Sequence, residues 1–365
     1  MTLPTNVPHR PPATLIEVAR QTLLRAREGH LSAPRQLVEM IALRLFYGLG
    51  PRHYHVARYW RKELSWKFKT GFWTYGKFRH HVNRLNSPAY QKLSQNKISE
   101  KSVLQLLSIP TPAFLGRLNL KYGCTSSGSE LKNGKDLIQL LVTESHINRF
   151  CCKVLEGYGG EGFRAVGVVR EPNLSLRMLD SGETLSAEDF CNNILQIPSG
   201  ADYTLEEYVQ QHPDLNRLNP SSVNTLRIWI LSNVEGASCL GAFLRVGRRG
   251  SIVDNTSQGA LAFAVDTVSG EIGEGQIKNI WNDRFECHMD SGERISGTRL
   301  PFLRESIDLA VRAVDAFPHI QFAGVDIAIT TRGPVVIELN VEPDPSSAII
   351  FDRSHQDIFG APVGE

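Results

Sequence analysis

Apolar residues recur at helical spacing near the start of the chain and form strand-like runs further on. Between residues 13 and 48 they fall three and four positions apart, with a break near 29–34, which predicts two helices separated by a turn. Two prolines at 108–114 predict a rigid connection between the end of a helix and the start of a strand. An amphipathic segment at 300–316 predicts a further helix. Short apolar runs predict strands at 149–155, 165–169, 221–232, 237–246, 261–266, 323–330 and 334–339.

Composition limits the class of protein. The chain has 365 residues, of which 41% are hydrophobic and 21% charged, so it can bury two or three cores and is not wholly disordered. The net charge of +2 argues against a globally basic nucleic-acid binder. No window holds 18 apolar residues, the proline-rich start lacks the apolar stretch of a signal peptide, and the six cysteines are scattered. We therefore expect a cytoplasmic protein with reduced thiols.

The segment between Arg44 and Lys101 is basic and aromatic. It holds thirteen Lys and Arg, two acidic residues (Glu63 and Glu100) and three of the five tryptophans. Basic residues interleaved with aromatic ones are typical of a surface for an anionic partner such as RNA, an acidic membrane surface or a phosphorylated substrate. The same pattern also fits an aromatic core stripe with a solvated basic face. The sequence leaves both interpretations open.

Three oxygen-bearing side chains interrupt the last two predicted strands. Asp326 lies within 323–330, and Glu338 and Asn340 end the next strand. Because side chains alternate along a strand, Glu338 and Asn340 share a face and could converge with Asp326. Oxygen ligands without His or Cys suit Mg²⁺ or Mn²⁺. The alternative is a pair of ordinary acids at the edge of a hairpin.

A lysine followed by a glycine-rich turn forms the second candidate site. Lys153 lies in the apolar run 149–155, directly after the adjacent Cys151 and Cys152, and four glycines follow within residues 157–162. Glycines allow backbone N–H groups to approach phosphate oxygens, and a lysine adds a point charge. The spacing matches neither the P-loop nor the dinucleotide-binding motif. An ordinary flexible turn is the alternative.

Two arginines and one alternating segment complete the candidate set. Arg227 and Arg245 stand at the ends of apolar runs, where they could clamp phosphate or carboxylate oxygens or form surface ion pairs. The segment 204–212 alternates apolar and polar positions and could be a strand whose backbone contacts the flat edge of a ligand.

Taken together, these residues resemble the ATP-grasp superfamily, and more narrowly its sugar-transfer-associated family. The resemblance covers roughly residues 90–350 and depends on the ending Asp326, Glu338, Asn340 and on 206–212 followed by 224–227. It implies an α+β fold of the ATP-grasp type, in which two α+β subdomains clasp ATP. A mainly helical N-terminal region would occupy residues 1–95, the lid subdomain 96–205, and the subdomain with the metal site 206–365.

The resemblance also implies a role for each motif residue. Lys97 and Lys153 would hold the phosphates. Arg227 and Arg245, together with Lys153, would steady the transferred phosphoryl group or an acyl-phosphate. The metal ligands of a two-Mg²⁺ site, which Mn²⁺ would also suit, would be Asp326, Glu338 and Asn340. The other nucleotide contacts would be the lid glycines Gly157, Gly159, Gly160 and Gly162, the adenine-binding hinge Glu206, Glu207 and Val209, and Gln211 and His212 near the ribose.

These roles imply an ADP-forming ligase that joins a carboxylate to an amine through an acyl-phosphate, in the biosynthesis of a small molecule or a surface-polymer precursor. The partners would then be a small carboxylate and a small amine, and an oligomer is compatible with the sequence. Two alternatives remain at this stage. One is a phosphotransferase that phosphorylates a hydroxyl acceptor. The other is a module that binds RNA or an anionic surface, such as a membrane, through the segment from Arg44 to Lys101 and carries a degenerate nucleotide site.

Overall fold

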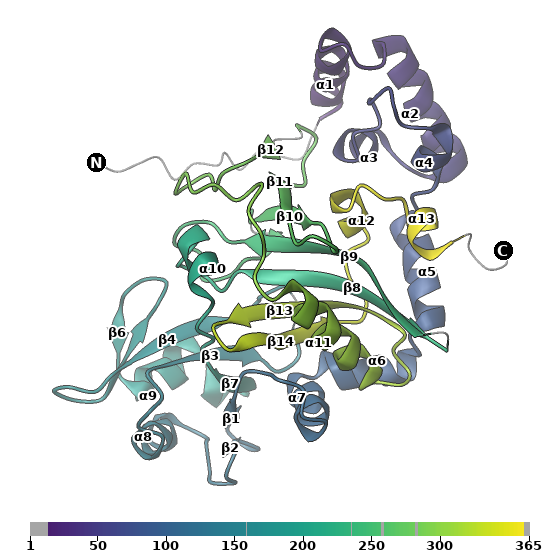
Figure 1. The fold of residues 1–365 in the computed structure, drawn as a ribbon. Helices are drawn as coiled ribbons and strands as arrows, with labels where there is room; N and C mark the ends of the chain where they lie inside the picture. Colours follow the sequence, from purple (N-terminus) through teal and green to yellow (C-terminus); the bar gives the residue numbers. More distant parts are fainter. Residues whose placement is uncertain (1–13, 158, 235, 257–258, 282–283, 361–365) are drawn as a thin grey trace.

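The computed structural model describes residues 14–157, 159–234, 236–256, 259–281 and 284–360. A helical N-terminal region precedes two antiparallel sheets of seven strands each (Figure 1). The two helices predicted near the start, with a break at 29–34, are confirmed. The N-terminal helices are α1 (Leu15–Arg27), α2 (Ala33–Tyr47), α3 (Pro51–Val56), α4 (Trp66–Thr70), α5 (Tyr75–Leu85), α6 (Pro88–Gln95) and α7 (Lys97–Leu106).

The first sheet has the strand order β2-β1-β7-β3-β4-β5-β6. In α8, Leu137, Leu140 and Leu141 recur at helical spacing and are buried in the core of this sheet together with Phe150 of β3. The strands are β1 (Phe114–Leu118), β2 (Cys124–Thr125), β3 (Arg149–Val154), β4 (Arg164–Val169), β5 (Ser175–Met178), β6 (Thr184–Leu185) and β7 (Tyr203–Glu207). The helical segments are α8 (Gly134–Thr143), α9 (Ala187–Asp189), the π-helix η1 (Phe190–Ile194) and the 3₁₀-helix η2 (Ile197–Ser199).

The second sheet has the order β12-β11-β10-β9-β8-β13-β14, and α11 packs on β8, β13 and β14. Along β13, Val325, Ile327 and Ile329 belong to the core under α11, so the alternate position Asp326 points to the opposite face. The strands are β8 (Thr225–Asn233), β9 (Gly236–Val246), β10 (Leu261–Val265), β11 (Ile272–Gln276), β12 (Arg284–Phe285), β13 (Phe322–Thr330) and β14 (Gly333–Asn340). The helices are α10 (Pro213–Leu218), α11 (Leu303–Asp315), α12 (Ser347–Ile350) and α13 (His355–Phe359).

A third core joins the N-terminal helices to the end of the chain. Trp60, Trp73 and Phe78 pack with Trp229 of the second sheet and with residues of α12 and α13. Two of the three tryptophans in the basic and aromatic segment are therefore core residues, and only Trp66 is exposed. Along the described parts of the chain, no helix combines the length and apolarity needed to cross a membrane.

The predicted strand positions are largely confirmed, with two local differences. The run 204–212 forms a strand only as far as Glu207, because His212 caps α10 and Pro213 begins that helix. The run 221–232 begins its strand at Thr225, because the side chain of Asn224 donates to the carbonyls of Leu215 and Asn219 and holds the preceding loop. All six cysteines carry free thiols, and Cys151 and Cys152 lie in β3 as predicted.

Candidate active site

A cavity of about 590 Å³ lies between the two sheets and collects most of the predicted site residues. It is lined by the glycine-rich loop, by β3, β7, β8, β9, β13 and β14, and by Arg52 and Val56 of α3. Of the residues predicted from the sequence, Gly162, Gln211 and His212 do not line it. Those that do are Lys97, Lys153, Gly157, Gly159, Gly160, Glu206, Glu207, Val209, Arg227, Arg245, Asp326, Glu338 and Asn340.

Strand alternation directs both arginines into the cavity. Leu226 and Ile228 of β8 belong to the core under α11, and so do Leu244 and Val246 of β9. The residue between each pair, Arg227 or Arg245, therefore faces the other way. The register of β8 and β13 sets Arg227 opposite Asp326, which in turn lies opposite Glu338 of β14.

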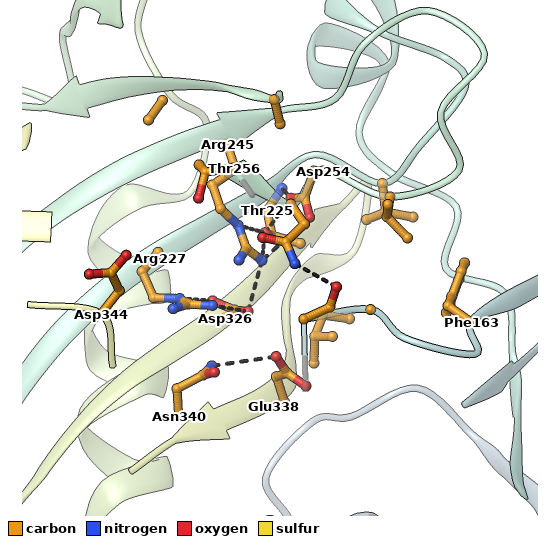
Figure 2. Close-up of a pocket in the computed structure, with 18 of the residues that line it drawn as sticks. Phe163, Thr225, Arg227, Arg245, Asp254, Thr256, Asp326, Glu338, Asn340 and Asp344 are labelled. Carbon is orange, nitrogen blue, oxygen red and sulfur yellow. Dashed lines mark hydrogen bonds and ion pairs between the residues drawn. The ribbon is translucent and has the colours of Figure 1, made fainter. Parts of the chain in front are cut away.

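Asp326 is fully buried and holds both arginines. Its Oδ2 accepts from Arg227 Nη2 at 2.7 Å and from Arg245 Nη2 at 2.8 Å, while Oδ1 accepts from Arg227 Nε. Burial alone would raise the pKa of Asp326, but the two guanidinium charges outweigh it and lower that pKa. In Figure 2 the arginines approach Asp326 from one side, and Glu338 and Asn340 lie on the other.

Arg245 is further fixed by Thr225 and Asp254. Its Nε and Nη2 donate to Thr225 Oγ1 at 3.0 and 2.6 Å. The Thr225 hydroxyl in turn donates to Asp254 Oδ2 at 2.5 Å, and the Thr225 backbone N–H donates to the same oxygen at 2.8 Å. Burial raises the pKa of Asp254, although the Arg245 charge opposes this. The guanidinium of Arg245 is thus held rigidly with one side toward the cavity.

The remaining oxygen ligands fit a divalent cation. Asn340 Nδ2 donates to Gly324 O at 3.2 Å, which leaves its Oδ1 able to bind a cation, and Glu338 forms no ion pair with any residue that the structure describes. Mg²⁺ is often held by one or two protein oxygens together with substrate phosphates, which matches this pair. Asp326 has lone pairs left for a cation, but its main contacts are the arginines. Within the described residues, no three His, Cys, Asp or Glu side chains gather as a metal site.

The lysine of the first sheet is paired with a buried carboxylate. Lys153 Nζ donates to Glu206 Oε2 at 2.8 Å, and Lys101 Nζ of α7 lies 3.2 Å from the same oxygen. Burial would raise the pKa of Glu206, but the two ammonium groups outweigh it and lower that pKa. Burial likewise opposes the charge of Lys153, yet the Glu206 carboxylate raises the Lys153 pKa overall. The Glu206 side chain thus holds the lysines, and only its backbone could serve as a hinge.

Lys97 and the glycine-rich loop lie beside this pair. Lys97 begins α7, and its Nζ donates to Gly157 O at 3.3 Å. Burial lowers the pKa of Lys97, and the charge of Lys153 adds to that effect. Gly159 and Gly160 adopt positive φ angles of 66° and 76°, which favour glycine. Gly159 O accepts from Asn255 Nδ2 of the second sheet's loop at 2.6 Å, so a hydrogen bond links the two walls of the cavity.

The hinge residues offer one backbone position to a ligand. The backbone N–H groups of Glu207 and Tyr208 donate to Ala113 O and Arg149 O. Val209 lines the cavity, and no described residue forms a backbone hydrogen bond with it. Gln211 is buried, and its Nε2 donates to Ser222 O at 2.8 Å. His212 Nδ1 accepts from Asp214 N at the start of α10. These two side chains hold local structure away from the cavity.

Several residues in or beside the cavity were not found from the sequence. Thr225 and Asp254, which hold Arg245, and Arg52 of α3 line it. Lys101 lies behind it and holds Glu206. An acid within an apolar strand, as at Glu206, was the one available signal of a buried charge pair. Thr225 and Asp254 lie only 20 and 9 positions from Arg245, but the strand pattern does not indicate that their side chains meet it. Arg52 reaches the cavity from a distant segment of the chain.

Glu100 of α7 is a further buried carboxylate beside the site. Its Oε2 accepts from the Leu339 N–H at 3.1 Å. Burial raises the pKa of Glu100 to about 8. The hydrogen bond from Leu339 lowers that pKa, and the negative charge of the neighbouring Glu338 raises it. Burial therefore favours the neutral form of Glu100 in the folded protein, and that form places no second negative charge beside Glu338.

We expect Glu100→Gln to raise the melting temperature by a few degrees at alkaline pH and by much less at acidic pH. The unfolded chain ionises Glu100 above a pKa of about 4.3. The folded protein resists ionisation up to about 8. Wild-type stability therefore falls as pH rises through that window, whereas a glutamine has no proton to lose. Thermal denaturation across this range, with the exposed Glu28→Gln as control, checks the prediction; an equal shift at every pH would contradict it.

Comparison with known proteins identifies the family. Residues 78–354, about three quarters of the chain, match the family described as sugar-transfer associated ATP-grasp, and the chain belongs to that family. The resemblance indicated by the site motifs is confirmed, as is the α+β fold with a helical N-terminal region. A search of curated proteins finds no match.

Distantly similar structures include three synthetases and ligases. D-cycloserine synthetase DcsG has 11% identity and a TM-score of 0.42, with 76% of each chain covered. Carboxyaminoimidazole ribonucleotide synthase from Aspergillus clavatus, complexed with ATP, has 14% identity and a TM-score of 0.43. The match covers 76% of this chain and 54% of that one. D-alanine–D-alanine ligase from Bacillus anthracis has 13% identity and a TM-score of 0.36, and the match covers 70% of this chain and 59% of that one. This chain therefore spans little more than half of the latter two, and no residue role is carried over from any of them.

Proposed function

We propose that this protein is an ATP-dependent ligase that joins a carboxylate to an amine and releases ADP and phosphate. The observation that carries the proposal is the convergence of four cations on one cavity. Lys97 and Lys153 line its first-sheet side, and Arg227 and Arg245 line its second-sheet side, close to the oxygen ligands of Glu338 and Asn340. Membership of an ATP-grasp family supports nucleotide binding in this cavity.

The reaction would proceed in two balanced steps. A carboxylate oxygen attacks the γ-phosphorus of ATP, the bond to the β-phosphate oxygen breaks, and ADP leaves. The amine nitrogen then attacks the acyl carbon, the C–O bond to phosphate breaks, and the amine loses a proton to solvent. Lys97 and Lys153 would hold the phosphates, while Arg227 and Arg245 would stabilise charge on the transferred group. Mg²⁺ bound at Glu338 and Asn340 would neutralise phosphate charge.

The charge pairing in the cavity bears on the choice between an amine and a hydroxyl acceptor. A kinase needs a carboxylate or histidine that can accept the hydroxyl proton. Four carboxylates of the cavity are already paired: Asp326 and Asp254 hold arginine, Glu206 holds lysine, and Asp344 pairs with Lys278 at 2.9 Å. Glu161, Glu207 and Glu338 also line the cavity, so the hydroxylamine assay described below has to distinguish the two acceptors. Cys151 also lines the cavity, but burial raises its pKa to about 12, so it is not a nucleophile at neutral pH. An unprotonated amine needs no such base to attack an acyl-phosphate.

Trapping with hydroxylamine tests the proposal before the natural amine is known. The protein is incubated with Mg²⁺-ATP, hydroxylamine and a panel of carboxylates, and ADP, free phosphate and hydroxamate are measured separately. Equal amounts of all three, absent with Glu338→Gln, would support the ligase. ADP formed with a phosphorylated hydroxyl acceptor and no free phosphate would establish a phosphotransferase. Failure to bind ATP in calorimetry would point to a degenerate nucleotide site.

Arg245→Ala is expected to lower kcat by about a hundredfold while changing ATP affinity much less, because it removes a donor aimed at the transferred group. Asp326 keeps Arg227 as a partner, but the buried Asp254 loses the guanidinium 3.4 Å from its Oδ1, so thermal denaturation of the variant is measured beside its kinetics. The matched control is Arg248→Ala, since Arg248 lies in the loop after β9, pairs with Asp290 and does not line the cavity. A loss of ATP affinity as large as the loss in kcat would place Arg245 on the bound nucleotide instead.

A further inference from the structure

The outer side of α2 carries large apolar side chains that no described part of the chain covers. Val38 is 64% exposed, Leu45 72% and Phe46 79%. With about 100° of rotation per residue, four apolar side chains share an arc of roughly 100° on this helix: Leu37, Val38, Ile41 and Leu45. The residues that α2 buries lie on the opposite side: Gln36, Glu39, Met40 and Leu43. A helix with apolar residues on both sides is missing a partner on one of them.

An exposed tryptophan extends this apolar surface. Trp66 at the start of α4 is 42% exposed. Its ring packs edge-on against the ring of Tyr47, the last residue of α2, with 6.3 Å between the ring centroids. The other tryptophans of the N-terminal region are buried. We call the exposed side chains of Leu37, Val38, Ile41, Leu45 and Trp66 the α2 face; Phe46, also exposed, lies about 80° beyond their arc. Tryptophan and tyrosine next to aliphatic side chains are typical of surfaces that enter the interface of a bilayer.

The exposed charges of α2 itself are of one sign, although Glu63 before α4 is an exposed acid. Arg44 and Lys67, which flank Tyr47 and Trp66, are exposed. The single acidic residue of α2, Glu39, is buried and accepts from Lys69 Nζ at 2.6 Å. Cations without exposed carboxylates on the same helix complement an anionic surface. Two copies of this face would instead bring like charges together, which opposes a symmetric dimer.

We propose that the α2 face binds the protein to the surface of a membrane that contains anionic lipids. The apolar side chains would enter the headgroup region with α2 parallel to the surface, while Arg44 and Lys67 meet lipid phosphates. In Figure 1, α2 lies at the end of the molecule remote from the first sheet, and none of its residues lines the cavity. Membrane binding would therefore leave the candidate active site open, and it does not depend on the proposed reaction.

Sedimentation of the full chain with lipid vesicles tests this proposal. We expect binding to vesicles of phosphatidylglycerol and phosphatidylcholine in equal parts, and little binding to phosphatidylcholine alone. Leu37→Gln, Ile41→Gln and Leu45→Gln combined should lower the partition coefficient at least about tenfold, because they remove the apolar contact but preserve helix propensity. Arg44→Gln with Lys67→Gln should also weaken binding and reduce its salt dependence.

A matched control carries the same substitutions at exposed apolar residues elsewhere: Leu106→Gln, Leu120→Gln and Val268→Gln. It should bind like the wild type. A blue shift of tryptophan fluorescence on anionic vesicles, absent in Trp66→Phe, would show that the α2 face itself enters the lipid. Absence of sedimentation, or equal loss in the control, would overturn the proposal. A wild-type dimer that the α2 variant converts to a monomer, without vesicle binding, would assign the face to a second copy.

Discussion

Glu338→Gln is expected to lower turnover by about a thousandfold or more, with little change in melting temperature. Glutamine keeps the size of the side chain but removes the negative charge that a divalent cation needs. Glu338 is half-buried, forms no ion pair among the residues described, and has two polar side-chain neighbours, Asn340 Nδ2 at 3.4 Å and the Asp326 carboxylate. The fold therefore depends little on its charge, whereas the proposed chemistry depends on it strongly.

Glu342→Gln is the matched control for this substitution. It makes the same change of charge in the same cavity, but the Glu342 carboxylate accepts from Tyr75 Oη at 2.7 Å and pairs with Arg79. ADP release at saturating ATP and thermal denaturation of both variants give the comparison. Retained activity in Glu338→Gln would remove the metal argument from the proposed function. An equal loss of activity in both variants would mean that the total charge of the cavity is required, and that Glu338 has no specific role as a metal ligand.

The strand pattern alone predicted part of this site. Apolar runs on both sides of Asp326 and before Glu338 indicated two neighbouring strands, and alternation put Glu338 and Asn340 on one face, where they could converge with Asp326. In the structure these residues stand opposite each other in β13 and β14, which a short hairpin joins. Local sequence fixes such a register because the turn and the buried face leave few alternatives.

Contacts between distant strands could not be predicted in this way. Arg227 and Asp326 are 99 positions apart, and they meet only because β8 pairs with β13. The sequence therefore indicated arginines for phosphate but gave no sign that a buried aspartate holds them in place. The same holds for Arg52, which reaches the cavity because the N-terminal helices share a core with the end of the chain.

The segment 206–212 was predicted to be a strand, but only its first two residues are in one. Alternation predicted a strand, and the resemblance placed adenine on its backbone and ribose near its end. Val209 does line the cavity, but the chain turns after Glu207 because Pro213 begins α10, and Gln211 binds the loop before β8. Side-chain roles within this segment depend on that turn, which alternation does not encode.

Glu206→Gln is expected to destabilise the protein by about 3–5 kcal/mol, because it leaves two buried ammonium groups without their shared carboxylate. Glu206 is fully buried, and Lys153 and Lys101 are 13% and 4% exposed at the side chain. Nucleotide affinity should fall as well, although the backbone of the hinge is unchanged, since Lys153 loses the contact that positions it. Urea denaturation and ATP calorimetry measure the two effects.

Lys153→Met separates the two roles of this pair. It removes one ammonium and leaves Lys101 to pair with Glu206, so it should cost less stability than Glu206→Gln but at least as much nucleotide affinity. The pH dependence gives a second check. Because the pKa of Glu206 is lowered in the folded state, its stabilisation is present above the unfolded pKa of about 4.3 and is lost as pH falls through the folded value. Wild type should therefore lose stability in acid more steeply than Glu206→Gln; parallel curves would mean that the carboxylate does not hold the lysines.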